Sequence, residues 1–176
     1  MLKRVKRIRL QRSFNLKTSV FTSWKVDLVR HYKKCFNADM KYSKIYKFVK
    51  DPADYKAVSK VLLDNYELIF EQYVHGQGHS NYPSVNMLDF TNICHSWRVV
   101  NRRDLSISDI DRLFFAVNFE EAQGEAADLD DNPDKELCRY EFFEIIARMA
   151  KLKYENQKLG LTVAESISKM LKEHVY

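Results

Sequence analysis

The stretch Asp-Asp-Asn-Pro-Asp-Lys-Glu-Leu-Cys-Arg-Tyr-Glu-Phe-Phe-Glu, residues 130–144, carries the most informative pattern in the chain. Its oxygen-bearing side chains recur at alternate positions, and a glutamate follows before an apolar run; the set is Asp130, Asn132, Asp134, Glu136 and Glu141. A calcium ion takes six to eight oxygen ligands, and a single loop with this spacing and a closing bidentate glutamate can supply them. The sequence therefore predicts a cation-binding loop at residues 130–141 that leads into a helix.

The same loop departs from a working calcium site in three ways. Its sixth position needs a sharp turn with positive φ, which favours glycine, and Lys135 stands there instead. Pro133 restricts the backbone two residues earlier. The helix before the loop begins at a capping box of Ser106 and Asp109, and residues 120–129 then form an insertion ahead of the first ligand. We therefore expect either no cofactor or Ca²⁺ at this loop.

An earlier segment repeats the arrangement without its ligands. If Val85 takes the eighth loop position, as Leu137 does in the later loop, then Gly78 stands at the first position and Asp89 at the twelfth. No carboxylate lies between Gly78 and Asp89. One short carboxylate cannot satisfy a cation that needs at least six oxygen ligands, so we expect this first loop to bind no metal.

Apolar spacing predicts helices ahead of both loops. An apolar face that includes Trp24 runs through residues 18–36, and a shorter helix is expected over residues 40–49. Asp51 is a good helix cap and Pro52 fits the first helical position, so the next helix starts there. Its apolar stripe continues to Tyr73, and we expect one uninterrupted helix up to that point.

The chain after the second loop carries the strongest helical pattern. Apolar residues at helical spacing run from Leu137 to Tyr154, and Gly160 marks a break. Thr162 and Glu165 form a further capping box, which opens a last helix over residues 162–175. This last helix either fills a groove between the preceding helices or completes the core, and the pattern favours neither.

Two helix–loop–helix units in tandem resemble the paired EF-hand-like domains of protist and ciliary (axonemal) proteins. The run Asn132-Pro133-Asp134-Lys135-Glu136-Leu137-Cys138-Arg139-Tyr140-Glu141-Phe142 carries most of the resemblance, which covers residues 52–154. The resemblance implies an all-α fold, with an EF-hand-like helix–loop–helix pair between additional N- and C-terminal helices. In that family such domains serve as structural adaptors on microtubules or on dynein and spoke complexes.

These patterns predict one domain with an arm. The expected segments are a basic extended arm at 1–17, an N-terminal helical segment at 18–50 and an EF-hand-like pair at 51–176. Within the pair, we expect the first hand at about 52–99, the second hand at about 106–154 and the C-terminal helix at 162–175.

Charge is divided sharply along the chain. Residues 1–50 hold 15 Lys and Arg against two acids, whereas the other 126 residues hold 14 basic and 22 acidic groups. The arm has seven basic residues, which we expect to bind partners: Lys3, Arg4, Lys6, Arg7, Arg9, Arg12 and Lys17. The arm is either a solvated, disordered tail or a segment that orders on an acidic protein surface.

Several functional classes find no support in the sequence. There is no P-loop or GxGxxG motif, and the five histidines have no Ser or Cys partner in a recognisable motif, so we expect no enzyme. No apolar run reaches the length of a membrane span, and no signal peptide is recognisable. Three cysteines without CxxC spacing favour a reducing compartment, and we expect a cytoplasmic location.

We therefore expect a non-catalytic structural or adaptor protein of a cytoskeletal assembly. The resemblance places it in the axoneme of a cilium or flagellum, with tubulin or an axonemal complex as the acidic partner. Two alternatives stay open. One is a calcium-sensing regulatory protein with a working site in the second hand, and the other is a nucleic-acid-associated protein that binds phosphates through the basic arm.

Overall fold

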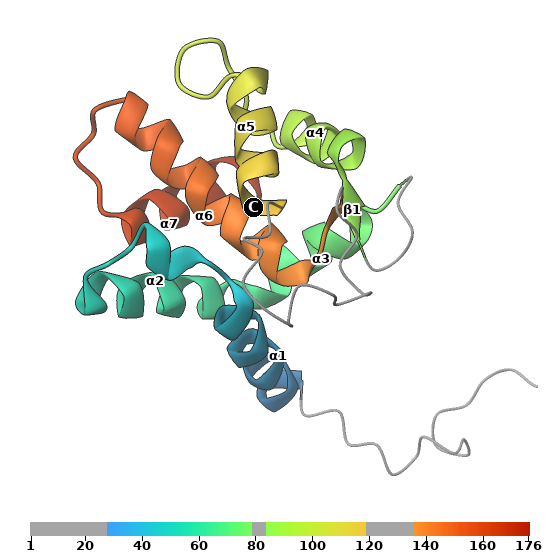
Figure 1. Ribbon diagram of the computed structural model, residues 1–176, viewed down its shortest axis with the longest axis vertical. Helices are drawn as coiled ribbons and strands as arrows, with labels where there is room; N and C mark the ends of the chain where they lie inside the picture. Colours follow the sequence, from blue (N-terminus) through green and yellow to red (C-terminus); the bar gives the residue numbers. More distant parts are fainter. Residues whose placement is uncertain (1–27, 79–83, 119–135) are drawn as a thin grey trace, which may run out of the picture.

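The computed structural model describes residues 28–78, 84–118 and 136–176, and these residues form an all-α fold (Figure 1). The elements are α1 (Leu28–Tyr42), the 3₁₀ turn η2 (Ile45–Lys47), α2 (Pro52–Asp64), α3 (Tyr66–His75), β1 (Val85–Asn86), α4 (Met87–Ser96), α5 (Ile107–Asn118), β2 (Glu136–Leu137), α6 (Arg139–Asn156) and α7 (Val163–His174). Within the described part of the chain, no helix is long and apolar enough to span a membrane.

Helix α6 occupies the middle of the fold and packs against α1, α3, α5 and α7 (Figure 1). Eleven of its 18 residues are buried, including Phe142, Phe143 and Ile146. A helix that buries this much of its surface is stable only when other elements cover it on several sides. The sequence of α6 therefore requires the surrounding helices to be arranged about it.

The predicted helix starts at 52, 106 and 162 are confirmed. Asp51 Oδ2 accepts hydrogen bonds from the backbone N–H groups of Ala53 and Asp54, at 2.9 and 3.0 Å, and α2 begins at Pro52. The Thr162 hydroxyl and the Glu165 carboxylate form the expected reciprocal contacts at the start of α7. The corresponding box at the start of α5 is likewise formed. These signals are local, so the sequence alone defines them.

Three predicted boundaries were wrong. Helix α1 continues to Tyr42 instead of ending at 36, because Phe36 and Asp39 are buried on the face that meets α6. The expected helix over 40–49 is reduced to the single turn η2. The expected continuous helix from Pro52 to Tyr73 breaks at Asn65, whose side-chain amide donates to the Val61 carbonyl at 2.7 Å.

A two-stranded antiparallel ladder joins the segments that precede α4 and α6. Val85 pairs with Leu137, and Asn86 pairs with Glu136. Both apolar members of the ladder are fully buried. Leu137 therefore belongs to a strand, which corrects the expectation that the last long helix begins with it.

We predict that Ile146→Ala lowers the free energy of unfolding by about 2–5 kcal/mol, because the side chain is fully buried in α6 and its removal leaves a cavity. The matched control is Ile107→Ala, since Ile107 is 37% exposed at the start of α5 and should cost clearly less. Urea unfolding of both variants measures the difference. A loss below about 1 kcal/mol for Ile146→Ala would contradict the central place of α6.

Candidate functional site

The two loop ends have the same local construction. Val85 and Leu137 pair in the ladder, and each is followed at once by the N-cap residue of a helix. A buried carboxylate then stands three residues beyond each N-cap, Asp89 in α4 and Glu141 in α6. Helices α4 and α6 thus both begin directly after a strand of the same ladder, with the same spacing of N-cap residue and carboxylate.

Each buried carboxylate residue takes part in the cap of its own helix. The backbone N–H of Asp89 donates to Asn86 Oδ1 at 2.8 Å. Glu141 Oε2 accepts from the backbone N–H of Cys138 at 2.9 Å, and the Cys138 thiol lies 3.1 Å from the same oxygen. Burial raises the pKa of the Cys138 thiol, and the neighbouring Glu141 charge adds to the shift, so this thiol stays protonated.

The two ends of the first loop, Gly78 and Asp89, lie close together. A Cβ placed on Gly78 would lie 3.3 Å from Asp89 Oδ1, so the first and twelfth predicted positions are adjacent. The residues between them include 79–83, which lie outside the described part of the chain. The predicted register of this loop therefore agrees with the position of its two ends.

The predicted metal ligands are only partly described. Asp130, Asn132 and Asp134 lie outside the described residues. Glu136 lies in β2, where its carboxylate accepts a hydrogen bond from the Ser84 hydroxyl of the first loop, and Glu141 caps α6. Residues 28–78, 84–118 and 136–176 contain no group of three or more His, Cys, Asp or Glu side chains that could hold a metal ion.

Both predicted ligands in the described part of the chain, Glu136 and Glu141, already accept hydrogen bonds from protein donors. A calcium loop uses both oxygens of its closing glutamate, and one oxygen of Glu141 is already engaged by the backbone that begins α6. The Glu136 carboxylate is likewise engaged, since it bonds to the opposite loop. A carboxylate has about four acceptor sites, so calcium would share Glu141 and Glu136 with these protein donors.

The C-terminal helix α7 covers α6 and α2 with a mostly apolar face that also includes the buried Ser166. Ile167, Met170 and Leu171 are buried there. The Tyr154 hydroxyl of α6 donates to the Glu173 carboxylate at 2.8 Å. At the end of α7, His174 Nδ1 lies 3.1 Å from the Trp97 carbonyl oxygen, and burial together with nearby Lys153 lowers the pKa of His174. Helix α7 is therefore part of the core.

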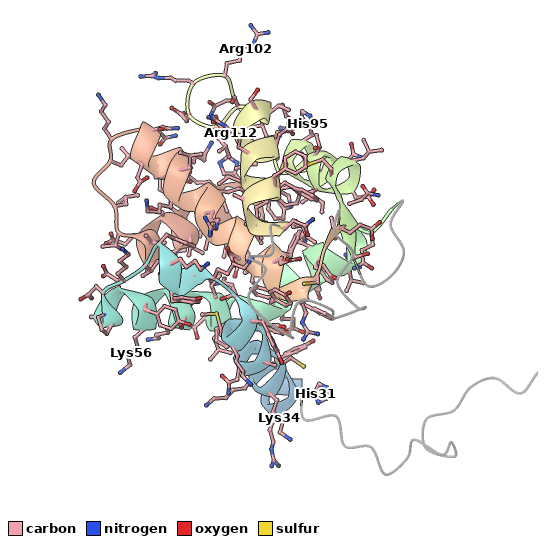
Figure 2. The ribbon with its side chains drawn as sticks, viewed as in Figure 1. His31, Lys34, Lys56, His95, Arg102 and Arg112 are labelled. Atoms are coloured by element: carbon pink, nitrogen blue, oxygen red, sulfur yellow. The ribbon has the colours of Figure 1, made fainter. Side chains whose placement is uncertain are left out.

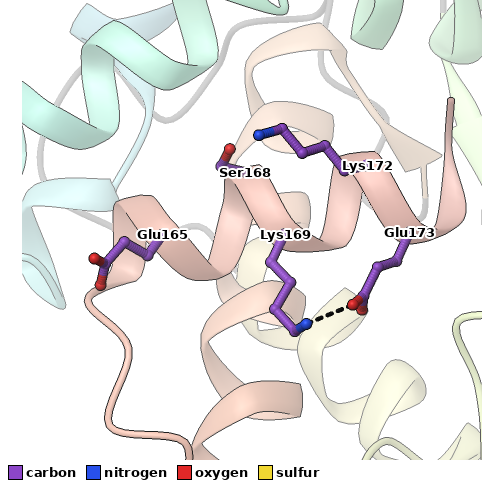
Figure 3. Close-up of a pocket in the computed structure, with 5 residues that line it drawn as sticks. All are labelled: Glu165, Ser168, Lys169, Lys172 and Glu173. Carbon is purple, nitrogen blue, oxygen red and sulfur yellow. Dashed lines mark hydrogen bonds and ion pairs between the residues drawn. The ribbon is translucent and has the colours of Figure 1, made fainter.

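The outer face of α7 carries a shallow depression, shown in Figure 3. Its lining residues all come from this one helix: Glu165, Ser168, Lys169, Lys172 and Glu173. Lys169 and Glu173 form an ion pair across it. Because no second element forms a wall, the depression has the character of a solvated helix surface.

Two polar contacts attach α1 and the turn after it to α6. Arg139 binds both carboxylate oxygens of Asp39, with Nε 2.8 Å from Oδ2 and Nη2 2.9 Å from Oδ1. The Tyr66 hydroxyl donates to Asp39 Oδ2 at 2.9 Å, and burial together with the Asp39 charge raises the pKa of Tyr66. The backbone N–H of Lys44 donates to Glu144 Oε2 at 2.6 Å. Sequence patterns contain no signal for these pairs, whose partners lie far apart along the chain.

The predicted partner-binding residues lie in the arm, outside the described part of the chain: Lys3, Arg4, Lys6, Arg7, Arg9, Arg12 and Lys17. The described helix nearest to them in sequence is α1, which is itself rich in basic residues. No family model, curated protein or solved structure matches this chain.

We predict that calcium at ~1 mM leaves the melting temperature unchanged relative to EDTA, because a ligand far below its Kd adds almost nothing to stability. Thermal unfolding followed by circular dichroism measures this. Glu141→Gln should lower the melting temperature equally with and without calcium, and Glu155→Gln, an exposed change on the same helix, serves as control. A rise of several degrees that Glu141→Gln abolishes would contradict this prediction.

Proposed function

We propose that the chain is a paired EF-hand-like module that acts as a non-catalytic adaptor in a cytoskeletal assembly. The observation that supports the pairing most strongly is the ladder between Val85 and Leu137. Leu137 takes the eighth position of the second loop, and Val85 is its counterpart in the register assumed for the first loop. The helices on either side of each loop are α3 and α4 in the first unit, and α5 and α6 in the second.

The local contacts favour a module that keeps one conformation without metal. Glu141 already serves as a helix cap, and Glu136 bonds to Ser84 across the ladder. Helix α7 covers α6 and α2, so the module supplies its own covering helix. A sensor must change shape when its ligand binds, and the ligand drives that change only if it binds one shape more tightly than the other. In this proposal the contacts of Glu141 and Glu136 leave calcium only a small difference of this kind. The adaptor function is therefore favoured over the calcium sensor.

The partner surface follows from the charge of the chain. The first 17 residues carry seven basic groups and no acid, which suits an acidic protein surface. The acidic filament that the resemblance implies is the microtubule, in the cytoskeleton of the cytoplasm and most specifically in the axoneme. In this proposal the helical module holds its place in the assembly while the arm contacts the filament.

We predict that the full chain co-sediments with microtubules and that a chain starting at Thr18 binds markedly less, because the truncation removes seven basic residues. Binding should weaken as salt shortens the Debye length from ~10 Å at 0.1 M to ~3 Å at 1 M.

Two full-length variants separate charge from apolar contact in the same assay. Changing the seven basic residues of the arm to Gln should reduce binding as strongly as the truncation. Changing Val5, Ile8, Leu10 and Phe14 to Ser tests whether apolar docking contributes at constant charge. Equal sedimentation of the full and truncated chains, or tighter binding of the full chain to RNA than to microtubules at matched salt, would contradict the adaptor function.

A further inference from the structure

We propose that the segment from the end of α1 to the start of α2 binds single-stranded nucleic acid, with tyrosine rings that stack on bases and lysines that contact phosphates. The proposal goes beyond the adaptor function and does not rest on it, and it concerns residues outside the basic arm. We call this surface the 41–50 surface, and its members are Lys41, Tyr42, Tyr46 and Lys50.

The sequence of this segment alternates basic and aromatic residues. Residues 41–50 read Lys-Tyr-Ser-Lys-Ile-Tyr-Lys-Phe-Val-Lys, with a lysine at every third position and no acid. Proteins that bind single strands combine positive charge along the phosphates with aromatic side chains on which successive bases stack. The segment contains both of these components within ten residues.

The fold turns the aliphatic residues of the segment inward and two of its tyrosines outward. Ile45 and Val49 are buried in the core, whereas Tyr42 and Tyr46 are 55% and 58% exposed. The hydrogen bond from the backbone of the segment to Glu144 of α6 holds the turn in place. A ligand that binds the 41–50 surface therefore does not have to order its backbone.

The two exposed rings offer different surroundings to a base. Tyr46 has no ring contact within the described part of the chain, so its faces are open to stacking. The Tyr42 ring lies beside Tyr140, with centroids 5.8 Å apart, and the Lys41 ammonium lies 5.7 Å from the Tyr42 centroid. Tyr46 is therefore the main stacking residue, and Lys41 places a cation next to the second ring.

Only two of the four lysines are assigned to phosphate contacts. The Lys44 ammonium lies 3.4 Å from the Val117 carbonyl oxygen, and Lys47 also has an interaction within the protein. Lys41 and Lys50 are exposed. Asp51 follows Lys50 directly and lowers the positive potential there, so Lys41 is the stronger phosphate contact.

The acids around the 41–50 surface leave its exposed side positive. Asp39 is bound by Arg139, and Glu144 accepts hydrogen bonds from Arg148 as well as from the segment. Exposed acids lie on the neighbouring helices: Asp51 and Asp54 at the start of α2, and Glu67 and Glu71 of α3, beside Tyr32 near the other end of α1. These acids flank the segment and do not interrupt it.

The combination of residues favours a nucleic acid over a protein partner. Tyrosine is enriched in protein interfaces as well, but lysine is depleted from them. The aliphatic residues that would add apolar contact to a protein, Ile45 and Val49, are buried. A single strand uses both features of the surface, because every base has a π-face and every nucleotide carries a negative charge.

The first test measures binding of a fluorescent oligouridylate of about 12 nucleotides to the full chain by anisotropy. Tyr46→Ala removes the ring and Tyr46→Phe retains it. The matched control is Tyr176→Ala, because Tyr176 is 76% exposed at the other end of the chain. The basic arm is present in every variant, so its contribution cancels in the comparison.

We expect Tyr46→Ala to weaken binding at least about fivefold, and Tyr46→Phe and Tyr176→Ala to weaken it less than about twofold. The same pattern is expected with oligothymidylate, since stacking does not need the ribose hydroxyl. Equal losses for Tyr46→Ala and Tyr176→Ala, or equal losses for Tyr46→Ala and Tyr46→Phe, would overturn the proposal.

The second test separates the lysines from the ring through the salt dependence of binding. Lys41→Gln, Lys50→Gln should reduce the slope of log K against log salt by about 1.4, because each phosphate contact to a single strand contributes about 0.7. Tyr46→Ala should leave the slope unchanged. The control is Arg102→Gln, Lys172→Gln, which removes two exposed charges from other elements; Figure 2 shows Arg102 at the opposite end of the structure from α1.

Two outcomes of the second test would contradict the proposal. One is an equal change of slope in the lysine variant and in the control. The other is a glutamate-rich peptide of equal charge that binds as tightly as the oligouridylate and loses as much affinity with Tyr46→Ala, which would assign the 41–50 surface to an acidic protein instead.

Discussion

The burial of α6 is the constraint on which the rest of the structure depends. Most of this helix is buried, and its buried residues include the charged side chains of Glu141, Glu144 and Lys153. Each charge needs a partner, because an unpaired charge in the interior is strongly unfavourable. Glu144 meets Arg148 and the Lys44 backbone, while the Lys153 ammonium donates to the Val99 carbonyl at 2.9 Å. Covering α6 therefore also fixes the turn after α1 and the segment after α4.

The same constraint bears on function. A helix enclosed by α1, α3, α5 and α7 leaves little apolar surface to expose without unfolding the core. A module of this kind is better suited to binding in one conformation than to switching between two conformations. A conformational switch needs two packings that differ by only a few kcal/mol. In the proposed adaptor function, charges on the exterior of the module would then distinguish its partners.

Local signals in the sequence predicted much of the fold. Asp51, Thr162 and the box at Ser106 define helix starts through contacts within three residues, and each was confirmed. The pairing of Val85 with Leu137 agrees with the register assumed for the first loop, in which both residues take the eighth position. Sequence patterns could not predict the long-range polar pairs. Asp39 and Arg139 are 100 residues apart, and nothing in the pattern links them. The extended end of α1 was missed for the same reason.

The candidate site was predicted less completely than the fold. The ligand spacing pointed to Glu141, but spacing cannot reveal that its carboxylate caps the helix after the loop. The basic arm was recognised by its density of charge, but its residues lie outside the described part of the chain.

The ladder between Val85 and Leu137 joins the two loops, and in the proposed adaptor it forms without metal. Nuclear Overhauser spectroscopy of isotope-labelled full-length protein in EDTA tests it most directly, because facing residues of an antiparallel pair lie only about 4.5–5.5 Å apart between Cα atoms. We expect nuclear Overhauser contacts between Val85 and Leu137, and we expect them to be unchanged when calcium replaces EDTA. Their absence in EDTA, or their appearance only with calcium, would contradict it.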